Sequence, residues 1–162
     1  MEFEYTTIHD QKFVNRSDKN SKELGNLNNK SIVICFKTKN KLEINDVLNL
    51  ILILIYEPNN NLENLHLTGT KMNDEDIQRF VNVLIHPNNK LKRLDIGFNE
   101  YITDKGVWAF ITSFNNPNNK IVSLGIGGSM ITVEIERELK KVINKTNNRL
   151  KHLYIHSSSI IN

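Results

Sequence analysis

One six-residue pattern occurs four times along this chain of 162 residues. It reads Leu-x-x-Leu-x-Leu, with isoleucine also found at the outer positions, and its central leucines lie 29, 30 and 29 residues apart, at Leu65, Leu94, Leu124 and Leu153. A Pro-Asn-Asn triplet keeps the same spacing, starting at Pro58, Pro87 and Pro117. A fixed period of about 20–50 residues indicates a solenoid, in which similar structural units stack side by side.

Each repeat reads as a short strand followed by a helix. Side chains alternate along a strand, so Leu65 and Leu67 are predicted to face inward while Asn64 and His66 face outward. The stretch 103–114 then has apolar residues at helical spacing. The same spacing recurs at Ile77, Phe80, Val81 and Leu84, and at Ile135, Leu139, Val142 and Ile143. Proline after two of these helices, with Asn-Asn beside it, predicts the turn back to the next strand.

The repeat boundaries follow from this reading. We expect an N-terminal cap or partly ordered extension over residues 1–30 and a repeat domain over 31–162. Within that domain the predicted units are repeats near 31–61, 62–90, 91–120 and 121–149, and a terminal strand at 150–156. The helix expected at 47–56 is apolar all round, which predicts burial on more than one side. The cap is therefore expected to fold over the first repeat.

The chain resembles leucine-rich repeats of the ribonuclease-inhibitor type in its period, in the pattern LxxLxIxxN and in the segment from Asp104 to Ile111. Tropomodulin caps and the GTPase activators of Ran share this type. The resemblance implies an α/β solenoid, with a parallel concave sheet of about four strands and helices on the convex side. It also implies binding of another protein, but no family member's functional residues carry over, because the matching motif is structural.

Composition narrows the range of functions. The net charge of +3 comes from 21 basic and 18 acidic residues, which is too weak a bias to indicate nucleic acid or an anionic membrane as partner. Cys35 is the single cysteine, so neither a disulfide framework nor a cysteine zinc site is expected. The apolar stretch 47–56 is half of the roughly 20 residues that a membrane span needs.

The expected location is the cytoplasm. The residues after Met1 are acidic where a secretory signal would be basic, and the lone cysteine agrees with a reducing compartment. Asparagine and isoleucine are abundant while Ala109 is the only alanine, as expected of an AT-rich genome. If the chain comes from a virus or an intracellular bacterium, the host cytoplasm is the alternative.

The outward residues of successive strands should form the binding surface, with Val33 of the first strand beside Asn64 of the second. Gly97, Gly125, Gly127 and Gly128 predict a bare patch, and polar or aromatic residues flank it. Concave faces are the usual contact surface of solenoids, and tyrosine and arginine are favoured anchors. The candidate protein-binding residues are Asn64, His66, Arg93, Asp95, His152, Tyr154 and His156.

No catalytic, cofactor-binding or metal-binding residue is predicted, and the chain is not expected to be an enzyme. His152 and His156 share a strand face, but no neighbouring ligand completes a zinc set. His66 and Asp95 could supply two parts of a catalytic triad, but no motif indicates a nucleophile. Non-catalytic protein recognition is therefore the preferred function.

Two other functions stay open at this stage. The first is regulation of a GTPase or another enzyme, although the chain lacks the acidic tail of the Ran activators. The second is self-assembly, since the terminal strand 150–156 would leave one edge unpaired and could support a homodimer.

The position after each strand that usually holds asparagine is occupied by Thr70, Asn99, Ser129 and Ser158, so we expect an incomplete asparagine ladder there.

Overall fold

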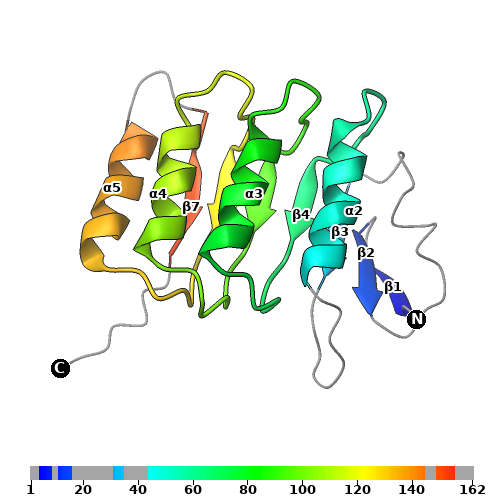
Figure 1. Cartoon of the computed structure of the whole chain (residues 1–162), viewed down its shortest axis with the longest axis horizontal. Coiled ribbons are helices and arrows are strands. Elements are labelled where there is room, and N and C mark those ends of the chain that lie inside the picture. Colours follow the sequence, from blue (N-terminus) through cyan, green and yellow to red (C-terminus); the bar gives the residue numbers. More distant parts are fainter. Residues whose placement is uncertain (1–3, 9–10, 16–30, 35–43, 145–148, 156–162) are drawn as a thin grey trace.

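The computed structural model describes residues 4–8, 11–15, 31–34, 44–144 and 149–155. One sheet runs through all of it, and four helices lie side by side against one face of that sheet (Figure 1). We call the other face the open face. The strands are β1 (Glu4–Ile8), β2 (Gln11–Asn15), β3 (Ser31–Ile34), β4 (Asn64–His66), β5 (Arg93–Asp95), β6 (Ser123–Gly125) and β7 (His152–Tyr154). The helices are α2 (Ile44–Tyr56), α3 (Asp74–Leu84), α4 (Asp104–Ser113) and α5 (Val133–Asn144).

The predicted leucine register is confirmed. Leu65 pairs with Leu94, Leu94 with Leu124 and Leu124 with Leu153 across parallel strands. The first three are buried, with at most 2% of their surface exposed. Leu153 is only half-buried, because β7 is the last strand of the sheet and no further described repeat packs beside it.

The α/β solenoid is confirmed, but the sheet is longer than the four strands expected. Among the described residues it has seven strands, of which β2 to β7 run parallel and β1 pairs antiparallel with β2. The N-terminal residues therefore extend the sheet at its edge. The pairing expected for the first strand was wrong by two residues: Ser31, and not Val33, lies opposite Asn64. A two-residue slip keeps every side chain on its own face, so hydrophobic alternation could not detect it.

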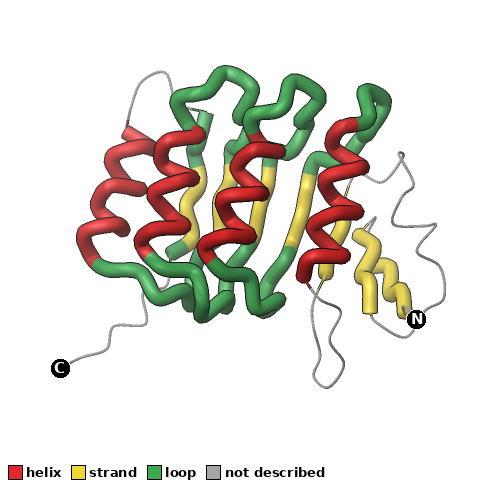
Figure 2. Tube along the Cα trace, viewed as in Figure 1, coloured by secondary structure: helices red, strands yellow, loops and turns green. Residues whose placement is uncertain are grey.

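The helices pack as their apolar spacing predicts, with one exception. Ile77 and Phe80 of α3, Val107 and Phe110 of α4 and Leu139 of α5 are fully or almost fully buried. Helix α2 was expected to be buried on more than one side, and Leu48, Ile51, Leu54 and Ile55 are buried. It nevertheless exposes 61% of Ile53 and 45% of Tyr56, because it lies in the same outer row as the other helices (Figure 2).

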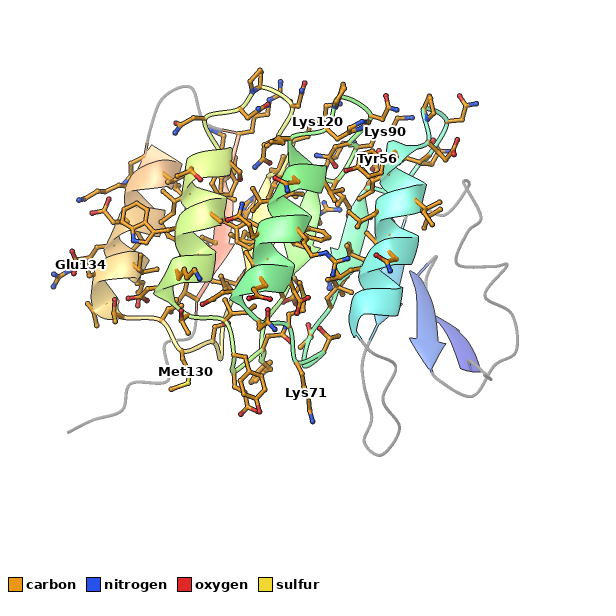
Figure 3. The ribbon with its side chains drawn as sticks, in the orientation of Figure 1. Tyr56, Lys71, Lys90, Lys120, Met130 and Glu134 are labelled. Atoms are coloured by element: carbon orange, nitrogen blue, oxygen red, sulfur yellow. The ribbon has the colours of Figure 1, made fainter. Side chains whose placement is uncertain are left out.

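Two rims border the sheet. We call the helix-to-strand turns 57–62, 85–91 and 114–121 the upper rim, and the strand-to-helix turns 67–73, 96–103 and 126–132 the lower rim. In Figure 3 Lys90 and Lys120 mark the upper rim, and Lys71 and Met130 mark the lower one. Both rims contribute to the hydrophobic core, the upper one through Leu62, Leu91 and Ile121 and the lower one through Met72 and Ile102.

The upper rim is held by a ladder of buried asparagines. Asn89 donates from Nδ2 to the carbonyl of Leu84 at 2.8 Å and, in the next turn, to that of Asn118 at 3.4 Å. Its Oδ1 accepts from the Leu91 amide at 2.9 Å. Asn60 makes the equivalent bonds to Ile55, Asn88 and Leu62. Asn119 also accepts from the Ile121 amide, but its Nδ2 donates to the Ser113 hydroxyl at 2.9 Å. Asn60 and Asn89 thus replace backbone partners that a helix end and a strand start would otherwise lack, and Asn119 does so at the strand start.

Carboxylates connect the repeats along the lower rim. Asp74, the first residue of α3, accepts from the amide and hydroxyl of Thr103 at 2.8 and 2.7 Å. Asp104 repeats these two bonds with Thr132 at the same distances. Negative charge at the first turn of a helix also suits the helix dipole. The strand-to-helix turns are therefore tied together through their helix-starting aspartates.

The asparagine ladder expected on the lower rim is incomplete, as predicted. Asn99 donates to the carbonyls of Leu67 and Ile96 at 2.9 and 2.7 Å, and its Oδ1 accepts from the amide of Met72 at 3.0 Å. Ser129 occupies the equivalent position one repeat later, and its Oγ is buried without a hydrogen-bond partner among the described residues. A hydroxyl is too short to span the distance that the Asn99 amide spans.

Candidate functional site

A hollow of about 210 Å³ lies on the open face, over β4 to β7. The LxxLxL pattern places alternate residues of these strands outward, and the parallel register sets them side by side. The lining combines one carboxylate, two basic side chains, two aromatic rings and three glycines. The lining residues are His66, Thr68, Arg93, Leu94, Asp95, Gly97, Phe98, Ser123, Gly125, Gly127 and Tyr154.

Asp95 is the charged centre of the hollow. Its Oδ2 lies 3.7 Å from Nδ1 of His66 in the neighbouring strand, and its Oδ1 accepts from the Gly97 amide at 3.0 Å. The His66 side chain, with the Gly97 amide and Thr68, holds the pKa of Asp95 below its ordinary value, although partial burial opposes this. Asp95 therefore stays ionised at neutral pH and presents a fixed negative charge on the open face.

The glycines of the floor allow Asp95 to lean toward β6. A Cβ on Gly125, directly beside Asp95 in the register, would lie 2.7 Å from Asp95 Oδ1. A Cβ on Gly97 would lie 3.2 Å from the same oxygen and 3.0 Å from the Gly127 carbonyl. Any larger residue at Gly125 would push the carboxylate away. The bare patch predicted from the sequence is thus the surface over which the carboxylate is displayed.

Phe98 stands at the lower-rim side of the hollow in an unusual conformation. Its φ is +55°, in the left-handed region, where the other two repeats have Gly69 at +66° and Gly128 at +75°. A bulky residue seldom adopts this region, which costs roughly 1–2 kcal/mol for a residue with a Cβ. The Phe98 side chain is nevertheless 71% exposed, and a Cβ on Gly128 would lie 2.9 Å from its ring. Strained residues concentrate at functional sites.

Four of the seven candidate residues meet in the hollow: His66, Arg93, Asp95 and Tyr154. Asn64 lies on β4 and accepts from Arg93 Nη1 at 3.1 Å, but does not line the hollow. His152 lies on β7 opposite Ser123, also outside the lining, and His156 lies outside the described residues.

Sequence reasoning missed Thr68, Ser123 and above all Phe98. Thr68 and Ser123 line the hollow but carry small hydroxyl side chains, which are not typical anchors. Phe98 could have been found by aligning the repeats, since it stands where the neighbouring repeats have glycine.

The geometry does not support a catalytic triad. In a triad the histidine must reach both the nucleophile and the carboxylate. Here strand β5 lies between β4, which carries His66, and β6, which carries Ser123, so two strand spacings of about 4.8 Å separate them. Ser123 is moreover opposite Arg93 and not Asp95. His66 therefore cannot take a proton from the Ser123 hydroxyl. Within the described ranges no cluster of histidine, cysteine and carboxylate side chains could hold a metal ion.

The apolar stretch 47–56 was expected to be too short to span a membrane. None of the helices in the described part of the chain is both long and apolar enough to cross a bilayer.

Comparison with known families gives one match. A family model described as Leucine Rich repeat matches residues 88–110, which contain the end of one upper-rim turn, β5, the lower-rim turn with Phe98 and Asn99, and most of α4. No curated protein matches the chain. The matched repeat carries Arg93, Asp95 and Phe98, so these three binding candidates lie within a leucine-rich-repeat unit.

Proposed function

We propose that this chain is a non-catalytic protein-recognition module of the ribonuclease-inhibitor-like type, and that its open face binds another protein. The observation that carries the proposal is Phe98, an exposed aromatic residue with a left-handed backbone that lines the same hollow as the Asp95 carboxylate. Folding alone favours glycine at this position, as in the neighbouring repeats. A residue that opposes stability while projecting into a hollow is best explained by a contact with a partner.

The size of the hollow supports recognition of one side chain rather than of a cofactor. Sites for drug-sized ligands measure about 300–1,000 Å³, and this hollow is smaller and lies on an open sheet. Protein interfaces, by contrast, concentrate their energy in a few anchor residues, with tyrosine and arginine among the most frequent. Tyr154, Arg93 and Phe98 provide such anchors at the edges of the hollow.

A peptide-display selection tests this proposal. Binders are selected on the unaltered chain and then measured against an open-face variant carrying Arg93→Ala, Asp95→Ala and Tyr154→Ala. The matched control carries Arg137→Ala, Glu134→Ala and Trp108→Ala, which remove the same kinds of group from exposed positions on α4 and α5. We expect selected peptides to lose affinity for the first variant and keep it for the second. Binders equally insensitive to both variants would contradict the proposal.

Self-association is a second candidate, supported by the end of the sheet. Among the described strands β7 pairs with β6 alone. Leu153 within β7 and Ile155 directly after it are only half-buried. An edge strand offers backbone donors and acceptors to a second copy, and a two-fold pair would close without further growth. Sedimentation over a range of concentrations tests this: a homodimer through β7 predicts a rising mass, and a monomer throughout would exclude it.

A further inference from the structure

We infer that the hollow receives a basic side chain, an arginine or a lysine of the partner, placed over β6 between Asp95 and the two aromatic rings. This inference rests on the proposed function and specifies what the open face recognises. Three features carry it: the charge of Asp95, the space above the glycines, and the positions of Phe98 and Tyr154.

Asp95 supplies the charge complementarity. It is the single carboxylate among the residues that line the hollow, and its lowered pKa keeps it ionised at neutral pH. His66 and Thr68, together with the Gly97 amide, engage most but not all of the about four acceptor sites that two carboxylate oxygens offer. The carboxylate lies over Gly125, with Oδ1 2.7 Å from where a Cβ on that residue would stand, so no side chain of Gly125 separates it from β6.

The positive groups of the hollow do not occupy this space. His66 belongs to β4, and Arg93 donates from Nη1 to Asn64, which also belongs to β4. Both basic side chains are therefore engaged on the side of Asp95 that faces away from β6. A cation approaching over β6 meets the carboxylate from its open side.

Aromatic rings complete the arrangement. Tyr154 of β7 is 62% exposed and lies opposite Gly125, while Phe98 is 71% exposed at the lower-rim side. Strands β5 and β7 are separated by two strand spacings, so roughly 9–10 Å lies between the backbones that carry Asp95 and Tyr154. The carboxylate takes the place of a Gly125 side chain, so a guanidinium or ammonium group would lie between Asp95 and the Tyr154 ring. Cations bind favourably against aromatic faces, and arginine does so most often.

Other occupants fit the lining less well. An acidic side chain would meet the charge of Asp95, which hydrogen bonding fixes in the middle of the hollow. A purely apolar side chain would cover the carboxylate without replacing its water, and desolvating an unpaired charge is unfavourable. A basic side chain satisfies the carboxylate and the rings together.

The experiment uses the peptides selected on the unaltered chain. The inference predicts that they share an arginine or lysine, and that replacing this residue by citrulline or norleucine, which keep much of the shape but lose the charge, weakens binding about tenfold. Because this substitution is made in the peptide, the result does not depend on the folding of a protein variant.

A protein variant provides the second arm. Asp95→Asn keeps an oxygen for the Gly97 amide while removing the charge, and should weaken the basic peptide about tenfold. Glu138→Gln is the matched control, because it removes the same charge from α5, where Glu138 pairs with Lys141. That control should leave binding unchanged.

The outcomes separate the two proposals. Peptides with an apolar or acidic shared residue that still depend on the open face would overturn the basic-side-chain inference and leave the proposed function standing. The inference is equally overturned if neither the citrulline replacement nor Asp95→Asn changes the affinity. Binders insensitive to all open-face substitutions, or no binders at all, would contradict both proposals.

Discussion

The two rims of this solenoid differ in how regularly they are built. Every described helix-to-strand turn of the upper rim contains the same buried asparagine, at Asn60, Asn89 and Asn119. On the lower rim the equivalent role falls to Asn99 alone, flanked by Thr70 and Ser129. The upper rim keeps a buried asparagine at the same position of each described turn. The lower rim repeats the bonds of Asp74 and Asp104, but the residue at the position of Asn99 changes from repeat to repeat.

Exposed apolar residues follow the same division. Phe98, Tyr101 and Met130 are all more than half exposed and all belong to the lower rim. The turn from Asn99 to the helix-capping Thr103 is also one residue longer than the turn from Thr70 to the cap Asn73. Both rims therefore bond neighbouring repeats to one another, and the lower rim differs in its exposed apolar residues and in the variable position of Asn99. The binding function that we propose uses these variable features and the adjoining hollow.

The largest expected effect on stability comes from removing a buried asparagine of the upper rim. Asn89→Ala leaves the Leu91 amide and the Leu84 carbonyl buried without their partner. Each of these two groups costs about 1–3 kcal/mol, so the free energy of unfolding should fall by roughly 2–6 kcal/mol in a urea titration. Asn82→Ala, an exposed substitution in α3, should change it by less than about 0.5 kcal/mol. Equal losses for both variants would remove the structural role assigned to this rim.

A smaller effect is expected from making the lower rim more regular. Ser129→Asn introduces the side chain that Asn99 uses to bond carbonyls of its own and the preceding repeat. It also removes a buried hydroxyl without a partner among the described residues. Thermal and urea unfolding should show a gain of about 0.5–1.5 kcal/mol, the net value of a hydrogen bond. A loss of stability would mean that the turn after β6 cannot hold the longer amide.

The smallest expected effect is a pH dependence of the folding stability that comes from Asp95 and not from the upper rim. The amides of the upper rim do not titrate, whereas the pKa of Asp95 in the folded chain is lowered. A lowered folded-state pKa stabilises the protein above the ordinary aspartate value, about 3.9, and this contribution is lost as pH falls through the folded-state pKa. The unaltered chain should therefore lose more stability between pH 7 and pH 3 than Asp95→Asn does. Parallel pH profiles would contradict the interaction of Asp95 with His66 and Gly97.

Much of the fold could be predicted from local pattern. The period placed Leu65, Leu94, Leu124 and Leu153 in one ladder, because strand alternation and a constant repeat length leave little choice of register. The position of the first strand could not be fixed, since its sequence lacks the LxxLxL pattern and a slip of two residues preserves alternation. The half-burial of Leu153 depends on its place at the end of the stack.

The site was harder to predict than the fold. Alternation identified which residues face outward, but not that Asp95 leans over Gly125, because this depends on side-chain distances. The Pro-Asn-Asn triplet was interpreted as a turn signal alone, since the bond from Asn89 to Asn118 is visible only once the repeats are stacked. The exposed position of Phe98 likewise required its backbone conformation.

Substitution of Phe98 by glycine tests the central claim most directly. The claim is that Phe98 opposes stability in the lower rim and serves recognition. Phe98→Gly gives the turn the residue found in both neighbouring repeats, so the free energy of unfolding should rise by about 1 kcal/mol. Affinity for peptides selected on the unaltered chain should fall about tenfold, as expected when an aromatic anchor is removed. Lower stability together with unchanged peptide affinity would contradict the account.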